Sequence, residues 1–143
     1  MRKDKFGEFI SRSLEETFAW GVAFGKSLTT GTTLALKGDL GSGKTSLMKG
    51  IAHGIIGIDP REVTSPTFTY LHIYHGKLHS LYHFDFYRLK KTEDFLALGF
   101  QDYFTTDHFC CIEWPECIST LLPPNTIELV LSHLEEGTRR ICF

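Results

Sequence analysis

The eight residues GDLGSGKT, from Gly38 to Thr45, constrain the fold of this chain more than any other stretch. They fit the pattern G-x-x-x-x-G-K-[ST], in which glycines let the backbone wrap closely and turn its N–H groups toward phosphates. The apolar run TTLALK precedes the glycines, and KTSLMKGIAHGI follows with the character of a helix. A strand, a glycine-rich turn and a helix in this order predict a phosphate-binding loop (P-loop), because the helix adds the positive end of its dipole to the same site.

Two side chains of this loop have predicted roles in binding a nucleoside triphosphate. We expect Lys44 to reach the β- and γ-phosphates, and Thr45 to place its hydroxyl on Mg²⁺. The alternative is a glycine-rich strand-to-helix turn with a surface lysine. The apolar strand before the loop and the helix after it make that alternative the weaker one.

Periodicity and turn signals outline the other elements. Ser13, followed three residues later by Glu16, is a capping box, and Thr92 is expected to cap a later helix. Strands alternating with helices, followed by hairpins, predict an α/β, P-loop NTPase-like fold with a mixed central β-sheet flanked by helices. The expected helices cover 13–28, 44–55 and 91–100, and the expected strands cover 32–38, 67–74, 77–85, 109–114, 126–133 and 138–143. The second and third of these strands, and the last two, are expected to form hairpins.

Two apolar runs end in a carboxylate, LYHFD at Asp85 and CCIE at Glu113. Strand ends in an open α/β sheet converge on the ligand crevice, so both carboxylates could reach one Mg²⁺. The alternative for each is a strand-end carboxylate in water or paired with a lysine or arginine. Two such ends beside a P-loop favour the metal interpretation.

The segment VTSPTFTY brings several hydroxyls close together. Pro66 restrains the backbone and biases the preceding residue toward an extended conformation. A hydroxyl here could coordinate Mg²⁺ or contact the γ-phosphate, as switch loops do, or the segment could be a turn leading into a strand. The residues alone leave both interpretations open. The candidate hydroxyls are those of Thr64, Ser65, Thr67 and Thr69.

Composition limits the class of protein. A length of 143 residues, 42% of them hydrophobic, suits one compact domain over residues 1–143 with one core. A net charge of -2 argues against a protein that grips nucleic acid through its overall charge. The N-terminus lacks the apolar run of a signal peptide, and no stretch is apolar enough to span a membrane. The clustering of Cys110, Cys111, Cys117 and Cys142 is unlike a secreted disulfide framework, so we expect reduced thiols and a cytoplasmic location.

The motifs GDLGSGKT, SPTFTY, HFDFYRL and IEWPE, in this order and spacing, resemble those of the bacterial TsaE family, and the resemblance covers nearly the whole chain. It implies a small ATPase needed to form threonylcarbamoyladenosine next to the anticodon of tRNA. It also implies TsaD and TsaB partners, of which TsaD carries the transfer chemistry, while ATP hydrolysis resets the complex for another turnover. The chain would then reach tRNA indirectly, through that complex.

The resemblance also implies roles for individual residues. Asp85 is expected near the metal and the attacking water. Whether Trp114 stacks on adenine or is a buried structural tryptophan stays open, as does the register of the contact near the C-terminus. The implied catalytic residues are Lys44, Asp85 and Glu113, and the implied Mg²⁺ ligands are Thr45, Asp85 and Glu113. The implied ATP contacts are Gly38, Asp39, Leu40, Gly41, Ser42, Gly43, Lys44, Thr45, Ser46, Thr67, Trp114, Thr138 and Arg139.

Other residue clusters have simpler explanations. The histidines at 72, 75, 79 and 83 lack the acid and cysteine spacing of a zinc site, so we expect ordinary strand histidines. Cys110 and Cys111 must point to opposite faces of a strand, and neither has an evident activating partner. Arg88 could pair with Asp85, reach the γ-phosphate, face a partner protein or cover aromatic surface with its stem, and these alternatives stay open.

Two rival functions have weaker support. A small-molecule or nucleotide kinase with a P-loop uses a lid carrying several arginines, whereas only Arg88 lies between Asp85 and Glu113. A GTPase is disfavoured because the single asparagine, Asn125, lies outside any Asn-Lys-x-Asp motif. A module that binds ATP without turnover would keep the P-loop but would not need both carboxylates.

Overall fold

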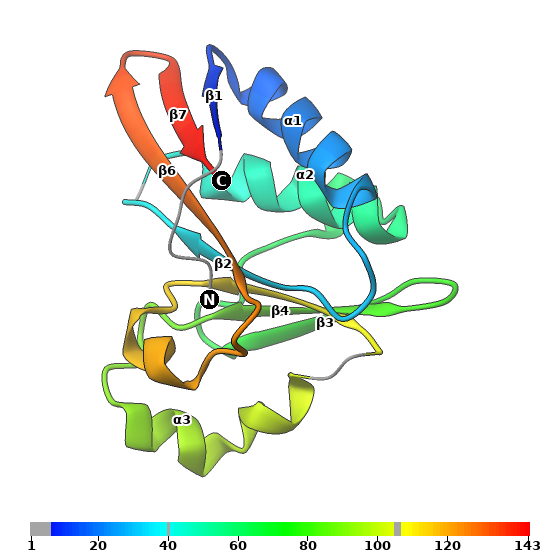
Figure 1. The fold of residues 1–143 in the computed structure, drawn as a ribbon, viewed down its shortest axis with the longest axis vertical. Coiled ribbons are helices and arrows are strands. Elements are labelled where there is room, and N and C mark those ends of the chain that lie inside the picture. Colours follow the sequence, from blue (N-terminus) through cyan, green and yellow to red (C-terminus); the bar gives the residue numbers. More distant parts are fainter. Residues whose placement is uncertain (1–6, 40, 105–106) are drawn as a thin grey trace.

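A computed structural model describes residues 7–39, 41–104 and 107–143, whose elements are shown in Figure 1. The strands are β1 (Glu8–Ser11), β2 (Thr33–Lys37), β3 (Leu71–His75), β4 (Ser80–Asp85), β5 (Phe109–Glu113), β6 (Ile127–Glu135) and β7 (Thr138–Cys142). The α-helices are α1 (Leu14–Lys26), α2 (Lys44–Ile56) and α3 (Thr92–Leu98). Short 3₁₀ turns are η1 (Pro60–Glu62), η2 (Phe100–Tyr103) and η3 (Glu116–Leu121).

The strands of the described residues form one sheet in the order β1-β7-β6-β2-β5-β4-β3. The central strand β2 runs parallel to both β5 and β6, and β4 runs parallel to β5. The pairs β3–β4, β6–β7 and β1–β7 are antiparallel. The predicted mixed sheet and both predicted hairpins are therefore confirmed. Because β2, β4 and β5 are parallel, their carboxyl ends meet at one edge of the sheet.

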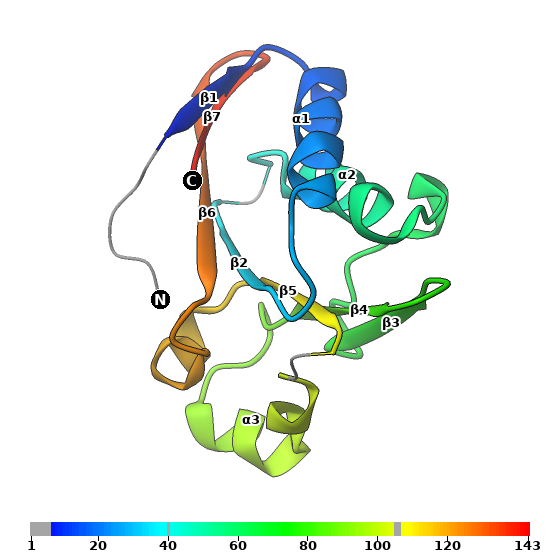
Figure 2. The ribbon, with the colours of Figure 1, turned by 45° about the vertical axis from the view of Figure 1, so that its right-hand side comes forward.

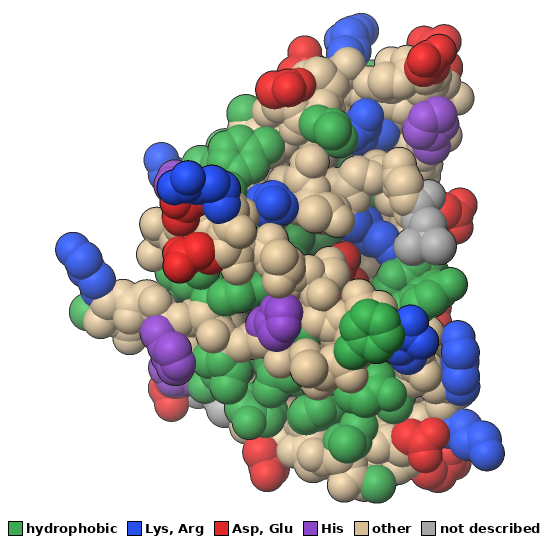
Figure 3. Space-filling view, turned by 180° about the vertical axis from the view of Figure 1, so that it is seen from behind, with side chains coloured by type: hydrophobic (Ala, Val, Ile, Leu, Met, Phe, Trp, Pro, Cys, Tyr) green, Lys and Arg blue, Asp and Glu red, His purple; other side chains and the backbone are tan. Residues whose placement is uncertain are grey.

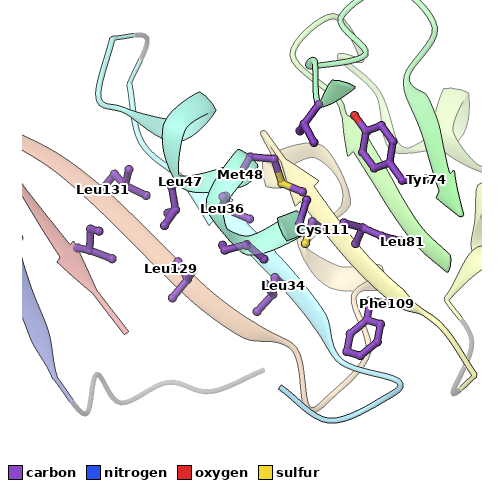
Figure 4. Close-up of a cluster of buried hydrophobic side chains, with 14 residues drawn as sticks. Leu34, Leu36, Leu47, Met48, Tyr74, Leu81, Phe109, Cys111, Leu129 and Leu131 are labelled. Atoms are coloured by element: carbon purple, nitrogen blue, oxygen red, sulfur yellow. The ribbon is translucent and has the colours of Figure 1, made fainter. Parts of the chain in front are cut away.

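Each face of the sheet has its own core. Leu34 and Leu36 of β2 pack with residues of α2 on one face, in the cluster drawn in Figure 4. Phe84 and Ile112 belong to a second, aromatic-rich cluster that includes Phe95 of α3. Figures 1 and 2 show α1 and α2 on one side of the sheet and α3 on the other. Strand side chains alternate between these faces, so neighbours in sequence enter different cores.

Helix α2, which begins at the P-loop, packs closely against α1. A Cβ added at Gly50 would lie 2.3 Å from the carbonyl oxygen of Phe18, and one at Gly54 would lie 2.3 Å from that of Val22. Only glycine fits at such an approach of two backbones. This contact fixes the position of α2 and therefore of the P-loop residues at its N-terminus.

Three local predictions needed correction or completion. The strand expected from residue 67 begins at Leu71, because residues 66–70 form a turn in which the Tyr70 N–H donates to the Pro66 carbonyl at 2.8 Å. Thr92 is not a cap: Lys91 precedes α3, and the Thr92 hydroxyl donates to the carbonyl of Cys117 at 2.7 Å. Strand β1 was not predicted, because four residues carry too little periodicity.

The capping box at α1 is confirmed in a modified form. The Ser13 hydroxyl accepts a hydrogen bond from the Glu16 N–H at 3.0 Å, as expected. The Glu16 carboxylate accepts from the N–H of Arg12, at 2.8 Å, rather than from that of Ser13. Among the described residues, no helix combines the length and the hydropathy needed to cross a membrane.

Candidate nucleotide site

A cavity of about 640 Å³ lies where β2, β4 and β5 end and α2 begins. Figure 3 shows the molecule from behind, with a hollow in which basic and acidic side chains lie beside each other. Most residues expected from the sequence at the catalytic centre line this cavity. The lining residues are Leu14, Gly41, Gly43, Lys44, Thr45, Ser46, Lys49, Ser65, Thr67, Asp85, Glu113 and Trp114.

The P-loop backbone adopts conformations that favour glycine. Gly43, which precedes α2, has φ 101° and leaves the helix N-terminus without a side-chain cap. Gly41 has φ 81°, and a Cβ there would meet no described atom within 4 Å. The first turn of α2 therefore keeps backbone N–H groups available to an anion.

Lys44 is a buried cation without a hydrogen-bond partner. Its side chain is buried, and its Nζ finds no partner among the described residues. The Nζ lies instead 3.5 Å from the centre of the Trp114 ring. Burial lowers the pKa of Lys44, although the carboxylates of Glu113, Glu116 and Asp85 act in the opposite sense. A buried, unpaired ammonium beside a glycine-rich loop fits an anion such as phosphate.

Asp85 and Glu113 lie side by side at the ends of parallel strands. They are partners in the register of β4 and β5, with exposed fractions of 4% and 3%. Burial raises the pKa of Asp85, and neighbouring Glu113 adds to this effect, while a hydrogen bond from the Tyr87 N–H to Oδ1 at 2.9 Å opposes it. Burial also acts to raise the pKa of Glu113, but hydrogen bonds from His83 and Ser65 outweigh it and hold that pKa below its usual value. Such opposite environments for two adjacent carboxylates are typical of functional sites.

The segment around Pro66 reaches the acidic end of the cavity. The Ser65 hydroxyl donates to Glu113 Oε2 at 2.8 Å, and Thr67 lines the cavity. The carbonyl of Tyr70 accepts from the Asp85 N–H at 3.0 Å, so the turn is tied to both acidic strands. The structure thus places the segment as a turn that leads into β3 and also abuts the candidate site.

The other predicted contacts lie around the loop. Arg139 of β7 is buried against the P-loop, because a Cβ at Gly43 would lie 2.9 Å from its Nη1. Ser42 is buried, and its N–H donates to the Asp39 carbonyl at 3.1 Å. Gly38, Asp39, Ser42, Thr138 and Arg139 are not among the residues that line the cavity. Leu40 lies outside the described residues.

Sequence reasoning missed two residues that belong to this region. Lys49 lines the cavity, and His83 holds Glu113 through a 2.7 Å hydrogen bond from Nε2 to Oε2. Lys49 could have been found from helical spacing, because it follows Thr45 and Ser46 by one turn. His83 shares the face of Asp85, two residues away on β4, and this spacing was the available signal.

The remaining candidate residues do not line the cavity. The other three strand histidines bond to separate partners: His72 to the Thr64 carbonyl, His75 to Ser80 and His79 to the Asp107 carbonyl. The four cysteines carry free thiols, and burial raises the pKa of Cys110 to about 12, which disfavours the nucleophilic thiolate. The Arg88 guanidinium lies 4.3 Å from the centre of the Phe68 ring.

The sheet topology, the glycine-rich loop between β2 and α2, and the two strand-end acids define a P-loop NTPase-like α/β protein. A structure search agrees: the crystal structure of Bacillus subtilis YdiB superposes with a TM-score of 0.79 and 30% sequence identity, covering 99% of this chain and 87% of that one.

The family follows from the sequence comparisons. The family model described as threonylcarbamoyl adenosine biosynthesis protein TsaE matches residues 11–141. A relative from Treponema pallidum, named tRNA threonylcarbamoyladenosine biosynthesis protein TsaE, is 44% identical over 132 residues, covering 92% of this chain and 96% of the relative. A Bacillus subtilis protein of the same name is 38% identical over 130 residues, covering 90% of this chain and 79% of its own length. The chain belongs to the TsaE family, as its motifs predicted.

Proposed function

We propose that this chain binds and hydrolyses ATP with Mg²⁺, as a subunit of the machinery that forms threonylcarbamoyladenosine in tRNA. The observation that carries the proposal is the buried Lys44 ammonium of the P-loop, which has no hydrogen-bond partner among the described residues, with two strand-end carboxylates in the same cavity. Membership of the TsaE family supplies the biological setting.

The residues present fit both ATP and Mg²⁺. The buried Lys44 Nζ has no hydrogen-bond partner within the described chain and lines the cavity, and phosphate oxygens are suitable acceptors for it. The cavity also holds the hydroxyl of Thr45 and the carboxylates of Asp85 and Glu113. Mg²⁺ prefers oxygen ligands and is held by one or two carboxylates together with waters and substrate phosphates, so this donor set is sufficient.

Each residue then has a defined task. Lys44 binds the β- and γ-phosphates, and the backbone from Gly38 to Ser46 surrounds them. Thr45 and Glu113 would hold Mg²⁺, and Asp85 would orient the attacking water beside it. When bound, Mg²⁺ neutralises charge that develops on the phosphates. Trp114 covers the Lys44 ammonium in the nucleotide-free protein, and the proposed ATP contacts of Thr67, Trp114, Thr138 and Arg139 complete the site.

The proposal includes TsaD-like and TsaB-like protein partners, contact with tRNA only through that complex, and a cytoplasmic location. Exposed apolar side chains near the cavity support a protein partner. Leu14 lines the cavity and is 52% exposed, and Phe68, in the turn beside it, is 77% exposed. A partner protein would cover these exposed apolar side chains on assembly. We expect the ATPase activity of the chain without its partners to be low.

Phosphate release from ATP tests this function. We expect release by the purified chain with Mg²⁺, a marked increase when TsaD-like and TsaB-like proteins are added, and loss on chelation of the metal. Formation of threonylcarbamoyladenosine on tRNA should require the chain under multiple-turnover conditions. Transfer of the phosphoryl group to a nucleoside would instead identify a kinase. Tight ATP binding without hydrolysis in any mixture would identify a binding module.

A further inference from the structure

A buried chain of hydrogen bonds connects Glu113 to the segment before Pro66. His83 has no exposed surface, and its Nε2 lies 2.7 Å from Glu113 Oε2. Its other ring nitrogen, Nδ1, lies 3.0 Å from the hydroxyl of Tyr74, which is 8% exposed. That hydroxyl lies 3.0 Å from the Thr64 carbonyl, to which it can donate, and it accepts from the Thr64 N–H at 3.3 Å.

The same segment also reaches Glu113 directly. The Ser65 hydroxyl donates to Glu113 Oε2 at 2.8 Å, on the same oxygen that His83 contacts. Glu113 is therefore joined to residues 64–65 by two routes, a short one through Ser65 and a longer one through His83 and Tyr74. Both hydrogen bonds use Oε2, and no described residue bonds to Oε1. The network fixes one carboxylate oxygen and leaves the other for a ligand.

The number of protons available for hydrogen bonding couples Glu113, at one end of the route through His83 and Tyr74, to Thr64 at the other end. A carboxylate only accepts, so the Glu113 contact favours the proton on Nε2 of His83, and Nδ1 of the neutral ring is then an acceptor. The single proton of the Tyr74 hydroxyl can go to this Nδ1 or to the Thr64 carbonyl, and His72 Nδ1 also lies 3.4 Å from the hydroxyl. His72 Nδ1 lies 2.9 Å from the same carbonyl and can donate to it in place of Tyr74.

Packing alone does not explain this network. Tyr74 lies on β3 at the edge of the core, opposite Leu81, and Figure 4 shows its ring beside apolar side chains. A phenylalanine would fill the same space, and burying polar groups costs free energy unless each is hydrogen-bonded. The polar groups of Tyr74 and His83 are therefore better explained by a role in orienting Glu113 and residues 64–65.

We propose that His83 is a positioning residue for the Glu113 carboxylate and that Tyr74 links this pair to residues 64–67, so that a displacement at either end is transmitted to the other. The inference rests on the proposed function for its purpose, because Glu113 is proposed to hold Mg²⁺ and residues 64–67 lie beside the proposed γ-phosphate position. The link between the residues is testable without nucleotide.

Amide hydrogen exchange of the nucleotide-free protein tests the link. Tyr74→Phe keeps the ring and removes the hydroxyl, so exchange of the Thr64 amide should rise about tenfold, the typical effect of one lost hydrogen bond. Glu113→Gln should raise exchange of the same amide, although it lies on another strand. The double variant should exchange much like a single variant, because both changes break one network. Tyr82→Phe, a tyrosine two residues from Phe84 on the other face of β4, is the matched control and should have no effect.

A second readout uses the metal. Tyr74→Phe and His83→Gln should raise the Mg²⁺ concentration that gives half-maximal phosphate release, while affinity for ATP without metal stays unchanged. Unchanged exchange in Tyr74→Phe, or additive effects of Tyr74→Phe and Glu113→Gln, would overturn the inference even if ATP is hydrolysed normally. Failure of the wild type to bind or hydrolyse ATP would overturn the proposed function, and the exchange measurement would still decide the link.

Discussion

The ammonium of Lys44 lies 3.5 Å from the centre of the Trp114 ring and has no hydrogen-bond partner among the described residues. Trp114 directly follows Glu113 and has a backbone φ of 54°, which is uncommon for a bulky residue. An aromatic face offers a cation about 0.5–2 kcal/mol, less than several charge-assisted hydrogen bonds to phosphate. The indole therefore stabilises the lysine without nucleotide and should lose this contact when phosphate binds.

Tryptophan fluorescence should report this exchange of partners. The chain has two tryptophans, and Trp20 packs against Phe24 and Phe143 away from the cavity. In a Trp20→Phe variant, MgATP should change the emission of Trp114, because the cation leaves its ring. A saturable change with the same midpoint as ATP binding supports the contact. An unaltered spectrum at saturating ATP would contradict it.

Hydrolysis should depend on Asp85 far more than binding does. Asp85→Ala removes a carboxylate at the proposed position of the attacking water, so phosphate release should slow by about 10²–10³-fold, the range for loss of one preorganised electrostatic group. ATP affinity should change little in this variant. In Lys44→Ala, by contrast, tight ATP binding itself should be lost. Equilibrium binding and phosphate release, measured side by side, separate the two effects, and normal turnover of Asp85→Ala would make Asp85 a structural residue.

The raised pKa of Asp85 predicts a stability change in the free protein. The folded chain keeps this proton at a higher pH than the unfolded chain, whose Asp85 has the usual pKa near 3.8. The contribution of Asp85 to the free energy of unfolding therefore falls as pH rises from about 3.8 through the folded-state pKa. Asp85→Asn should raise the thermal midpoint at pH 7, because the uncharged amide avoids the cost of burying a carboxylate.

The pH dependence supplies the control for that prediction. The stabilisation by Asp85→Asn should shrink as the pH approaches the usual aspartate pKa, because the wild-type side chain is then protonated in both states. Glu113 has a lowered pKa and contributes in the opposite sense, and it is present in both proteins. Loss of its repulsion with the Asp85 charge favours the Glu113 carboxylate and therefore acts in the same direction as the predicted stabilisation at pH 7. Thermal unfolding at a series of pH values, without nucleotide or Mg²⁺, measures the difference. A variant less stable than wild type at pH 7 would refute the prediction.

A methyl group at Gly43 should affect binding more than stability. Gly43→Ala forces alanine into φ 101° and brings its Cβ to 2.9 Å from Arg139 Nη1. The guanidinium is the far end of a flexible side chain and can move, so the loss of stability should be about 1–2 kcal/mol, the cost of the left-handed backbone. ATP affinity should fall strongly, because the loop and Arg139 are both displaced.

Gly57→Ala is the matched control for that change. Gly57 ends α2 with φ 71°, and a Cβ there would meet no described atom within 4 Å. It should lose similar stability and keep ATP affinity. Chemical denaturation and equilibrium binding distinguish the two variants, and wild-type affinity in Gly43→Ala would place the nucleotide away from the loop.

Much of this architecture could be predicted because its signals are local. The spacing of Gly38, Gly43 and Lys44 encodes the loop, and alternating side chains with short polar turns encode the two hairpins. The acidic ends of β4 and β5 could be predicted to meet because parallel strands end at one edge. The structure places Asp85 and Glu113 in register there.

The features that escaped prediction depend on distant parts of the chain. Strand β1 exists because it pairs with β7, at the other end of the sequence. The strand pattern of 67–70 gave way to a turn, in which Tyr70 bonds back to Pro66 and has φ 67°. The bond between His83 and Glu113 depends on which strands become neighbours, and no local pattern specifies that.

The most direct measurement is a crystal structure with Mg²⁺ and a non-hydrolysable ATP analogue. It should show Lys44 Nζ about 3 Å from phosphate oxygens and away from the Trp114 ring. The metal should contact the Thr45 hydroxyl and at least one of the carboxylates of Asp85 and Glu113. A nucleotide bound outside the loop, with the Lys44 ammonium still on the indole, would contradict the proposed site.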